Sequence, residues 1–363
     1  MSILITGGAG YIGSHMVHEL ADSGQEPVVI DDLRTGFQWA LPSGIELVVG
    51  DVGDELLVKE IIKTFQVDAI VHFAGSVVVP DSIKDPLGYY LNNTVKSRAL
   101  IAAAIDGGVK RFIFSSTAAV YGAPATIPIG ETAPLQPMSP YGASKLMTEM
   151  MLADTAAAHD FRYVALRYFN VAGADPMGRT GQSTKNATHL LKAACETALG
   201  KRKAIEVFGT DYLTRDGTCI RDYIHVKDLV RAHIAALTYL EAGGKSEIFN
   251  CGYSRGYSVL EVIDAVRRVS GRDFTVIRSA RRDGDPAEIV ADSTKIRNLL
   301  NWRPQYDALD GIIESALAWE DRLTDLSPTA RIHPLGAMGF GDDSTPLPGF
   351  PASQWPANEW SQP

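Results

Sequence analysis

The sequence predicts an α/β protein with a Rossmann-type, doubly wound parallel sheet followed by a smaller mixed α/β domain. In the first half of the chain, short unbroken apolar runs alternate with longer helical patterns. Such runs are typical of strands that crossover helices bury on both faces. A glycine-rich turn follows the first run, and after Asn170 the pattern loosens into loops rich in Gly, Asp and Thr with shorter elements.

Six apolar runs are the predicted strands of the first domain. They are residues 2–6, 27–31, 46–51, 69–75, 111–116 and 162–169. A further strand is expected at 204–209, with helices at 227–240 and 259–270. We therefore expect a first domain at 1–170 and a second domain at 171–322, with a later segment, about 215–240, that packs back onto the first domain. Residues 323–363 are expected to form an irregular Pro/Gly-rich tail.

Composition narrows the class of protein. Of the 363 residues, 45% are hydrophobic and 21% are charged, and no apolar run reaches the roughly 18 residues that indicate a membrane span. The net charge of −9 disfavours nucleic-acid binding, which needs a basic surface. The start of the chain lacks the features of a signal peptide, so we expect a cytoplasmic protein without a membrane partner.

The cysteines do not suggest a metal site. Cys195, Cys219 and Cys251 are odd in number and widely spaced. This arrangement resembles no metal-ligand pattern and suits free thiols in a reducing compartment. We expect all three to be buried for structural reasons.

The glycine-rich turn "ILITGGAGYIGSH" predicts a phosphate-binding loop. It places three glycines after the first strand and at the start of a helix: Gly7, Gly10 and Gly13. Glycine lets the backbone turn tightly and approach a pyrophosphate, which the free N–H groups of the helix terminus then hold. The pattern alone is weak, because it also occurs in ordinary turns.

Acidic residues after the second strand indicate which dinucleotide binds. Asp31 follows Gly13 by eighteen residues, where a carboxylate accepts hydrogen bonds from an adenosine ribose. With Asp32 it would repel a ribose phosphate, so NAD is favoured over NADP, although Arg34 leaves NADP open. The loops at 50–52 and 72–75 follow the next two strands and meet the same edge of the sheet, where such sheets bind ligands.

A second motif pairs a phenol with an ammonium. In "PYGASK", Tyr141 and Lys145 are four residues apart, which places them on one face of a helix. Such a pair alone usually marks a solvated helix surface.

These motifs, with "FSST" at 114–117, resemble the extended short-chain dehydrogenase/reductase family and in particular its UDP-sugar 4-epimerases. The resemblance continues through "RYFN", "FGTDY", "DGTCIRDYIHVKDL" and "RRDGD", and covers about residues 2–320. It implies an enzyme that inverts C4 of a UDP-hexose, UDP-glucose or UDP-galactose, through a 4-keto sugar that turns within the site while NAD takes and returns the hydride.

The resemblance implies that Thr117, Tyr141 and Lys145 are the catalytic residues. Tyr141 would act as the general base and Thr117 would hydrogen-bond the same sugar oxygen. Lys145 and the oxidised nicotinamide would lower the pKa of the phenol. A decrease of about two units corresponds to roughly 2.7 kcal/mol. Ala118 and Ala119 stand where sugar-nucleotide dehydratases carry an acidic pair, so dehydration is not expected.

The resemblance also implies the binding residues. Those for the cofactor are Gly7, Gly10, Tyr11, Ile12, Gly13, Asp31, Asp32, Asp51, Val52, Phe73, Ala74, Gly75, Asn93, Ser115, Tyr141, Lys145 and Tyr168. Those for the substrate are Thr117, Phe169, Asn170, His189, Phe208, Arg221, Arg282, Asp285 and Ile289. Within that set, Arg221 and Arg282 would hold the diphosphate, as guanidinium forks suit phosphate oxygens. Phe169 and Phe208 would flank the uracil ring.

Three positions depart from the family pattern. Val77 replaces a lysine that contacts the cofactor in some relatives, and 188–189 (Thr-His) replaces an asparagine pair. Ile289 replaces a tyrosine of several strict glucose/galactose enzymes, so the accepted sugar is left open. A UDP-pentose or UDP-N-acetylhexosamine 4-epimerase remains an alternative, as does a non-catalytic dinucleotide-binding regulator. We expect a homodimer formed through the helices at 93–106 and 141–158.

Overall fold

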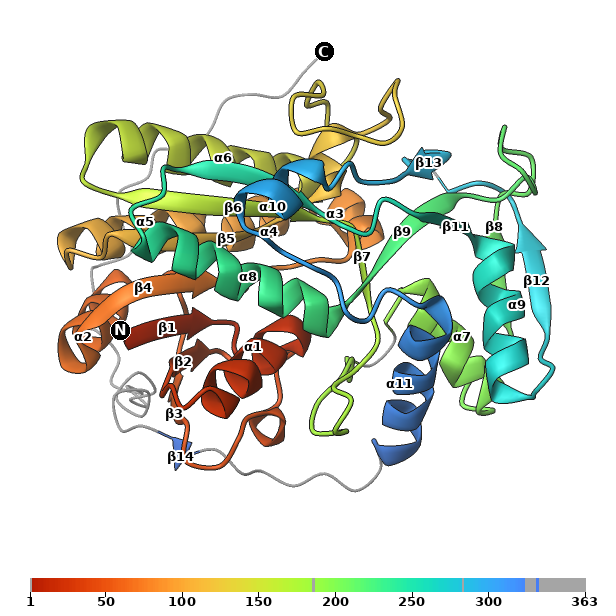
Figure 1. Ribbon diagram of the computed structural model, residues 1–363, viewed down its shortest axis with the longest axis horizontal. Helices are drawn as coiled ribbons and strands as arrows, with labels where there is room; N and C mark the ends of the chain where they lie inside the picture. Colours follow the sequence, from red (N-terminus) through yellow and green to blue (C-terminus); the bar gives the residue numbers. More distant parts are fainter. Residues whose placement is uncertain (1, 185–186, 283, 324–330, 333–363) are drawn as a thin grey trace, which may run out of the picture.

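A parallel eight-stranded sheet forms the centre of the computed structural model, which describes residues 2–184, 187–282, 284–323 and 331–332 (Figure 1). Its strand order is β10-β6-β5-β4-β1-β2-β3-β14. The strands are β1 (Ser2–Thr6), β2 (Val28–Asp31), β3 (Glu46–Val49), β4 (Val67–His72), β5 (Arg111–Thr117), β6 (Arg162–Tyr168), β10 (Glu247–Cys251) and β14 (Arg331–Ile332). The predicted Rossmann-type fold is confirmed, and the order reverses at β1, where such sheets bind ligands.

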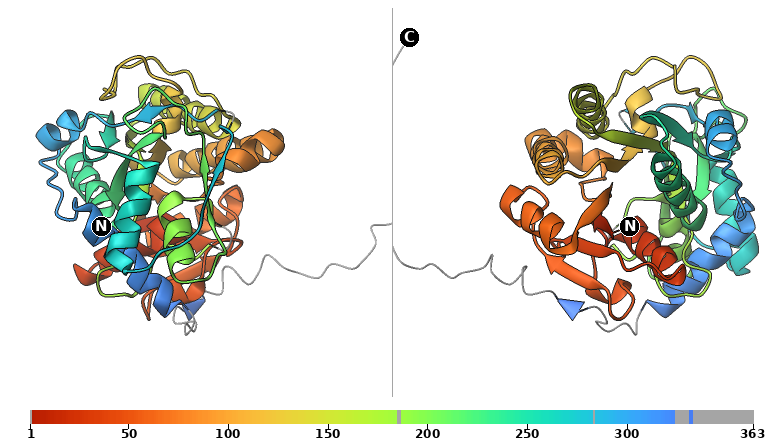
Figure 2. Two further views of the ribbon diagram at one scale, coloured as in Figure 1. Left: turned by 90° about the vertical axis from the view of Figure 1, so that its right-hand side faces the viewer. Right: turned by 60° about the vertical axis from the view of Figure 1, so that its left-hand side comes forward.

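Helices cover both faces of this sheet (Figure 2). On one face lie α1 (Tyr11–Asp22) and α8 (Val226–Glu241), and on the other α2 (Glu55–Phe65), α5 (Lys96–Asp106) and α6 (Pro140–Ala158). Met16 and Leu229 belong to the apolar core of the first face, whereas Ile61, Leu100 and Leu152 belong to that of the second. Both faces of the strands are therefore apolar, which explains their unbroken hydrophobic runs.

Shorter elements lie at the loops between these helices and strands. They are the 3₁₀ turns η1 (Gln38–Ala40) and η3 (Ala118–Tyr121), the helices α3 (Val79–Lys84) and α4 (Pro86–Tyr89), and the π-helical turn η2 (Tyr90–Val95). The start of α6 is fixed locally, because the Ser139 hydroxyl accepts a hydrogen bond from Gly142 N at 3.2 Å and Pro140 occupies the first helical position. Tyr141 thereby lies in the first turn of α6.

Among the described residues, the second domain contains two small sheets and four helices. Most of them lie on the right-hand side of Figure 1, whereas α10 contacts β10 of the large sheet. The first sheet comprises β7 (Asn170–Ala172), β9 (Ile220–His225), β11 (Gly256–Ser258) and β13 (Glu288–Ile289), and the second comprises β8 (Ile205–Phe208) and β12 (Val276–Ser279). The helices are α7 (Leu190–Ala198), α9 (Val259–Ser270), α10 (Thr294–Leu299) and α11 (Leu309–Arg322). The segment that returns to the large sheet comprises α8 and β10, so it begins and ends later than the expected 215–240.

Part of the chain expected to be an irregular tail is a strand. Residues 331–332 form β14, which pairs in parallel with β3 at the sheet edge. The remainder of that segment, 324–330 and 333–363, lies outside the described residues. No described helix is long and apolar enough to cross a membrane. The three cysteines are free and buried, as expected.

A buried ion pair connects α6 to the sheet. Arg167 of β6 donates to both carboxylate oxygens of Glu149 of α6, with Nε–Oε1 at 2.9 Å and Nη2–Oε2 at 2.5 Å. Both side chains are almost wholly shielded from solvent, at 2% and 3% exposure. The Tyr121 hydroxyl accepts from Arg167 Nη1 at 2.9 Å and donates to Asn250 Oδ1 at 2.7 Å, which extends the network to β10.

We predict that Glu149→Gln lowers the free energy of unfolding by about 3–5 kcal/mol, because it leaves the Arg167 guanidinium buried without a counter-charge. Chemical denaturation monitored by circular dichroism measures the change. The matched control is Asp106→Asn, which breaks the exposed pair with Lys59 and should change stability by less than about 1 kcal/mol. Equal effects of the two substitutions would contradict the prediction.

Candidate active site

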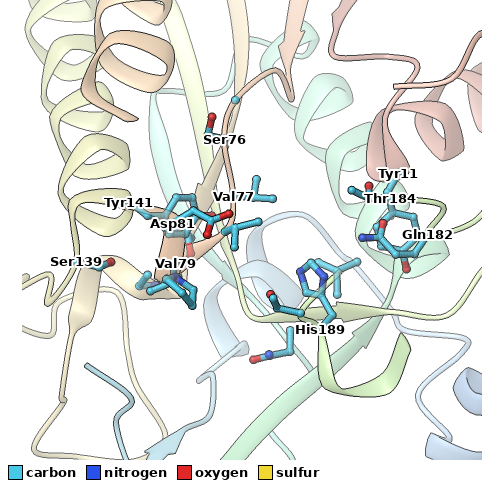
Figure 3. Close-up of a pocket in the computed structure, with 18 of the residues that line it drawn as sticks. Tyr11, Ser76, Val77, Val79, Asp81, Ser139, Tyr141, Gln182, Thr184 and His189 are labelled. Carbon is cyan, nitrogen blue, oxygen red and sulfur yellow. Dashed lines mark hydrogen bonds between the residues drawn. The ribbon is translucent and has the colours of Figure 1, made fainter. Parts of the chain in front are cut away.

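A cavity of about 1250 Å³ lies between the carboxyl ends of the large sheet and the second domain. The loops after β1, β2, β4 and β5 line one part of it, and residues from β8, β9 and β13 line the other. In Figure 3, Tyr141 and Ser139 lie on one side of the cavity, and Tyr11 and Gln182 lie on the opposite side. The cavity therefore brings together the two motifs that were identified separately in the sequence.

The glycine-rich turn has room for backbone only. A Cβ atom at Gly13 would lie 2.2 Å from the carbonyl oxygen of Gly7, which no substitution could accommodate without moving the main chain. Gly7 has a φ of +66°, and its Cβ would lie 2.6 Å from Ala74 N. Gly7, Gly10 and Gly13 all line the cavity at the start of α1. This cradle fits a pyrophosphate held against a helix N-terminus.

Asp31 occupies the end of β2 and has a structural role as well as a place in the cavity. Its carboxylate accepts hydrogen bonds from Ala9 N and Leu33 N, each at 2.9 Å. Burial raises the pKa of this carboxyl above its usual value, and the two N–H donors oppose that rise. Asp31 thus ties the glycine-rich turn to β2 while it lines the cavity.

The charge of Arg34 is offset by its neighbours. Its Nε lies 2.6 Å from Asp32 Oδ2, and its Nη2 donates to Asn92 Oδ1 at 3.0 Å. The guanidinium is thus already paired with an acid. NAD stays the favoured dinucleotide, because the acid Asp32 lies beside this guanidinium.

Thr117 and Tyr141 lie together in the cavity wall. Thr117 ends β5, and Tyr141 lies in the first turn of α6. Burial raises the pKa of the Tyr141 phenol, and a hydrogen bond with Thr117 opposes the rise. The expected lowering of this pKa by Lys145 is therefore not seen in this structure.

Lys145 lies behind the cavity wall. Its Nζ donates to the carbonyl oxygen of Ser115 at 3.0 Å and lies 5.0 Å from the centre of the Phe114 ring. Burial lowers the pKa of the ammonium to about 8. The ammonium thus holds the end of β5, and in this structure it is not among the causes of the shift in the pKa of Tyr141.

Two other expected cofactor residues, Asn93 and Ser115, do not line the cavity among the described residues. Asn93 accepts from Ser76 N at 2.7 Å and donates to Ser144 Oγ at 3.0 Å. It therefore joins the turn after β4 to α6. Ser115 hydrogen-bonds through its hydroxyl to Tyr168, which does line the cavity. The contacts expected between these two residues and the cofactor stay predictions.

The side of the cavity that the second domain lines combines two arginines, an aromatic ring and an acid. The Arg282 guanidinium lies 4.6 Å from the centre of the Phe208 ring, and its Nε lies 2.9 Å from Asp285 Oδ2. Arg221 of β9 is 3.9 Å from Asp285, a long separation that leaves the guanidinium able to bind an anion. The guanidinium groups suit a phosphate, the Phe208 ring suits an aromatic base, and the Asp285 carboxylate suits ribose hydroxyls.

The other expected substrate residues also line the cavity: Phe169, Asn170, His189 and Ile289. Ile289 of β13 pairs in register with Arg221 of β9 and packs with Phe169 and Ala118. Val77, which replaces the lysine of some relatives, lines the cavity and is half exposed. The binding roles of these residues stay predictions.

The family model for the NAD dependent epimerase/dehydratase family matches residues 3–252. The chain belongs to this family. The expected NAD cofactor is confirmed by that membership, and the expected enzyme class by the family together with curated relatives that are UDP-glucose 4-epimerases.

Relatives within the family agree over most of the chain. The sequence is 55% identical over 321 residues to a UDP-glucose 4-epimerase of Azospirillum brasilense, which spans 88% of this chain and 92% of the relative. A solved UDP-glucose 4-epimerase of Brucella ovis in complex with NAD has a TM-score of 0.85 at 42% identity, and covers 90% of this chain and 99% of its own. A solved UDP-Glc/GlcNAc 4-epimerase of Campylobacter jejuni has a TM-score of 0.78 at 48% identity. This match covers 88% of the present chain and 99% of the Campylobacter chain.

Sequence reasoning missed several residues of this epimerase-family cavity. They include Asp81, Met138, Gln182, Thr184, Arg202 and Cys219. Asp81 belongs to α3, a helix of six residues with no motif to draw attention to it. The others come from loops or strand edges whose position depends on tertiary packing. Two of the missed residues, Gln182 and Thr184, lie near Tyr11 in Figure 3.

We predict that the protein binds NAD more tightly than NADP by at least roughly tenfold, equivalent to about 1.4 kcal/mol. The buried Asp31 carboxylate would repel a phosphate on the ribose, and Arg34 is already paired with Asp32. Isothermal titration calorimetry on cofactor-stripped protein measures both affinities. Asp31→Asn should reduce the ratio of the NAD affinity to the NADP affinity. Asp68→Asn, at the opposite end of the strands, is the control and should leave that ratio unchanged. Tighter binding of NADP by the unsubstituted protein would contradict the prediction.

Proposed function

We propose that this enzyme inverts the configuration at C4 of a UDP-sugar, with UDP-glucose and UDP-galactose as its substrates. The observation that supports this best is one cavity that joins a dinucleotide cradle, a Thr117–Tyr141 pair and an arginine-containing end suited to a nucleoside diphosphate. The 55% identity to a UDP-glucose 4-epimerase favours the glucose/galactose pair over pentose or N-acetylhexosamine substrates. The intact Thr, Tyr and Lys set disfavours a non-catalytic regulator.

Tyr141 is the proposed general base. NAD, held by the glycine-rich turn and Asp31, would supply hydride transfer from C4 of the sugar and back to the opposite face of the 4-keto sugar. Tyr141 takes the proton of the 4-hydroxyl and later gives it back. Because burial raises the pKa of a lone phenol here, Tyr141 needs a nearby positive charge to release its proton. Lys145 supplies part of that charge in this proposal and also holds the end of β5 through Ser115.

The proposed substrate pose follows from the two ends of the cavity. Arg221 and Arg282 bind the diphosphate, Phe208 stacks on the uracil and Asp285 accepts from the uridine ribose. The sugar then reaches Thr117 and Tyr141. Small side chains follow Thr117, namely Ala118 and Ala119, in place of the acidic pair that a dehydratase uses to remove water from the sugar. These residues favour epimerisation over dehydration.

We also propose that the enzyme is a homodimer. Leu87, Leu91 and Val95 follow one another at four-residue intervals through α4 and η2, and all three are more than half exposed. Met147 and Met150 of the neighbouring α6 are exposed as well. An apolar stripe of this kind on a soluble domain favours burial against another subunit. Val95, Met147 and Met150 lie within the helices expected at 93–106 and 141–158, whereas Leu87 and Leu91 precede them.

We predict that Tyr141→Phe lowers kcat by roughly 10²–10⁴-fold, the usual effect of removing a general base. Retained NAD content and UDP affinity would show that the site is intact. The matched control is Tyr163→Phe, because Tyr163 is a buried tyrosine of β6 that does not line the cavity. Turnover near that of the unsubstituted enzyme would assign the base to another residue.

For the dimer, we predict that light scattering at micromolar concentration gives twice the mass of one chain. The double variant Leu91→Glu/Met150→Glu should shift the mass to that of one chain, because it places two carboxylates in the proposed interface. Leu213→Glu is the control, since Leu213 is fully exposed in the second domain. A monomeric unsubstituted protein would refute the proposal.

A further inference from the structure

The charges that line the cavity are unevenly distributed. Arg221 and Arg282 lie at the proposed nucleotide end with Asp285. Arg34 is paired with Asp32, and Arg202 with Glu196 of α7. Among the described lining residues, only one further cation remains, Lys84 of α3. Among the described lining residues, every arginine is therefore either paired with an acid or assigned to the proposed nucleotide end.

The wall around Tyr141 carries a carboxylate. Asp81 of α3 lines the cavity, and Figure 3 shows it on the same side as Val77, Val79 and Tyr141. Helix α3 packs against α6, which carries Tyr141, and both Asp81 and Tyr141 act electrostatically on the Tyr89 phenol. Asp81 thus lies on the same side of the cavity as Tyr141, which the sugar reaches in the proposed pose.

The negative charge of Asp81 is only weakly offset. The contact with Lys84 Nζ is long, at 3.9 Å, and the two side chains are 58% and 79% exposed. Ion pairs of this kind contribute little and are screened by water. The cavity wall at Asp81 consequently keeps most of one negative charge.

We propose that Asp81 is a specificity-determining residue that selects neutral sugars and rejects UDP-sugars with a carboxylate at C5. This inference rests on the proposed function and extends it to the substrate class. Inversion at C4 requires the 4-keto ring to present both faces to one fixed cofactor, so the C5 substituent visits more than one wall of the cavity. A uronate carboxylate would then meet Asp81, whose charge Lys84 offsets only weakly at 3.9 Å, and like charges brought together suppress binding.

Competition experiments with two UDP-sugars test this directly. UDP-glucuronate and UDP-xylose differ only in the C5 carboxylate, so their inhibition constants against UDP-galactose turnover isolate its effect. Any influence of Asp81 on the diphosphate cancels in the ratio of the two constants. The unsubstituted enzyme should bind UDP-xylose more tightly than UDP-glucuronate.

Asp81→Asn keeps the size and hydrogen-bonding capacity of the side chain. In this variant the ratio of the UDP-glucuronate inhibition constant to the UDP-xylose inhibition constant should fall by roughly tenfold, because the repulsion is removed. Asp160→Asn is the control, because it also removes an acid from an exposed pair with a lysine, Lys110, but at the distant end of α6. Its ratio should match that of the unsubstituted enzyme. The difference between Asp81→Asn and the unsubstituted enzyme should also shrink at about 1 M salt, where the Debye length is about 3 Å.

Two results would overturn the inference: equal affinity of the unsubstituted enzyme for the two ligands, or an Asp81→Asn ratio that equals that of Asp160→Asn. Failure of the proposed function would look different. In that case, no neutral UDP-hexose would be epimerised by the unsubstituted enzyme, whatever the inhibition constants of the two ligands.

Discussion

The ion pair between Arg167 and Glu149 joins the parts of the molecule that have to meet at the cavity. Glu149 lies two turns after Tyr141 in α6, and Arg167 lies just before Tyr168 at the end of β6. Through Tyr121 and Asn250 the same network reaches the turn after Thr117 and the returning strand β10. The direction of α6 relative to β5, and with it the Thr117–Tyr141 contact, depends on this set of bonds.

A buried pair of this kind contributes more to a defined geometry than to net stability, because desolvation of both charges offsets much of their attraction. The cost is recovered only when each polar atom finds a partner. Here the guanidinium donates to Glu149, to Tyr121 and to the Glu131 carbonyl oxygen. An alternative packing of α6 would leave some of these donors unpaired, so the network favours one arrangement.

A buried carboxylate organises the second domain in a similar way. Asp222 of β9 is shielded from solvent and accepts from Tyr253 N and Ser254 N at 2.9 Å and from Ala291 N at 3.3 Å. Burial raises its pKa to about 6, against the effect of those donors. Because side chains alternate along a strand, the burial of Asp222 directs the adjacent Arg221 towards the cavity. The same contacts hold the chain after β13, next to Ile289.

The sequence by itself determined the features that depend on short-range patterns. Buried strands need unbroken apolar runs, the turn before α1 accepts only glycine at Gly7 and Gly13 because any Cβ would meet the main chain, and Asp31 is placed by its distance from that turn. Tertiary structure decided the rest. It placed Lys145 and Asn93 behind the wall, bonded Arg34 to Asn92, and brought Asp81 of α3 beside Tyr141. These outcomes depend on contacts between residues distant in sequence, whose packing no local periodicity encodes.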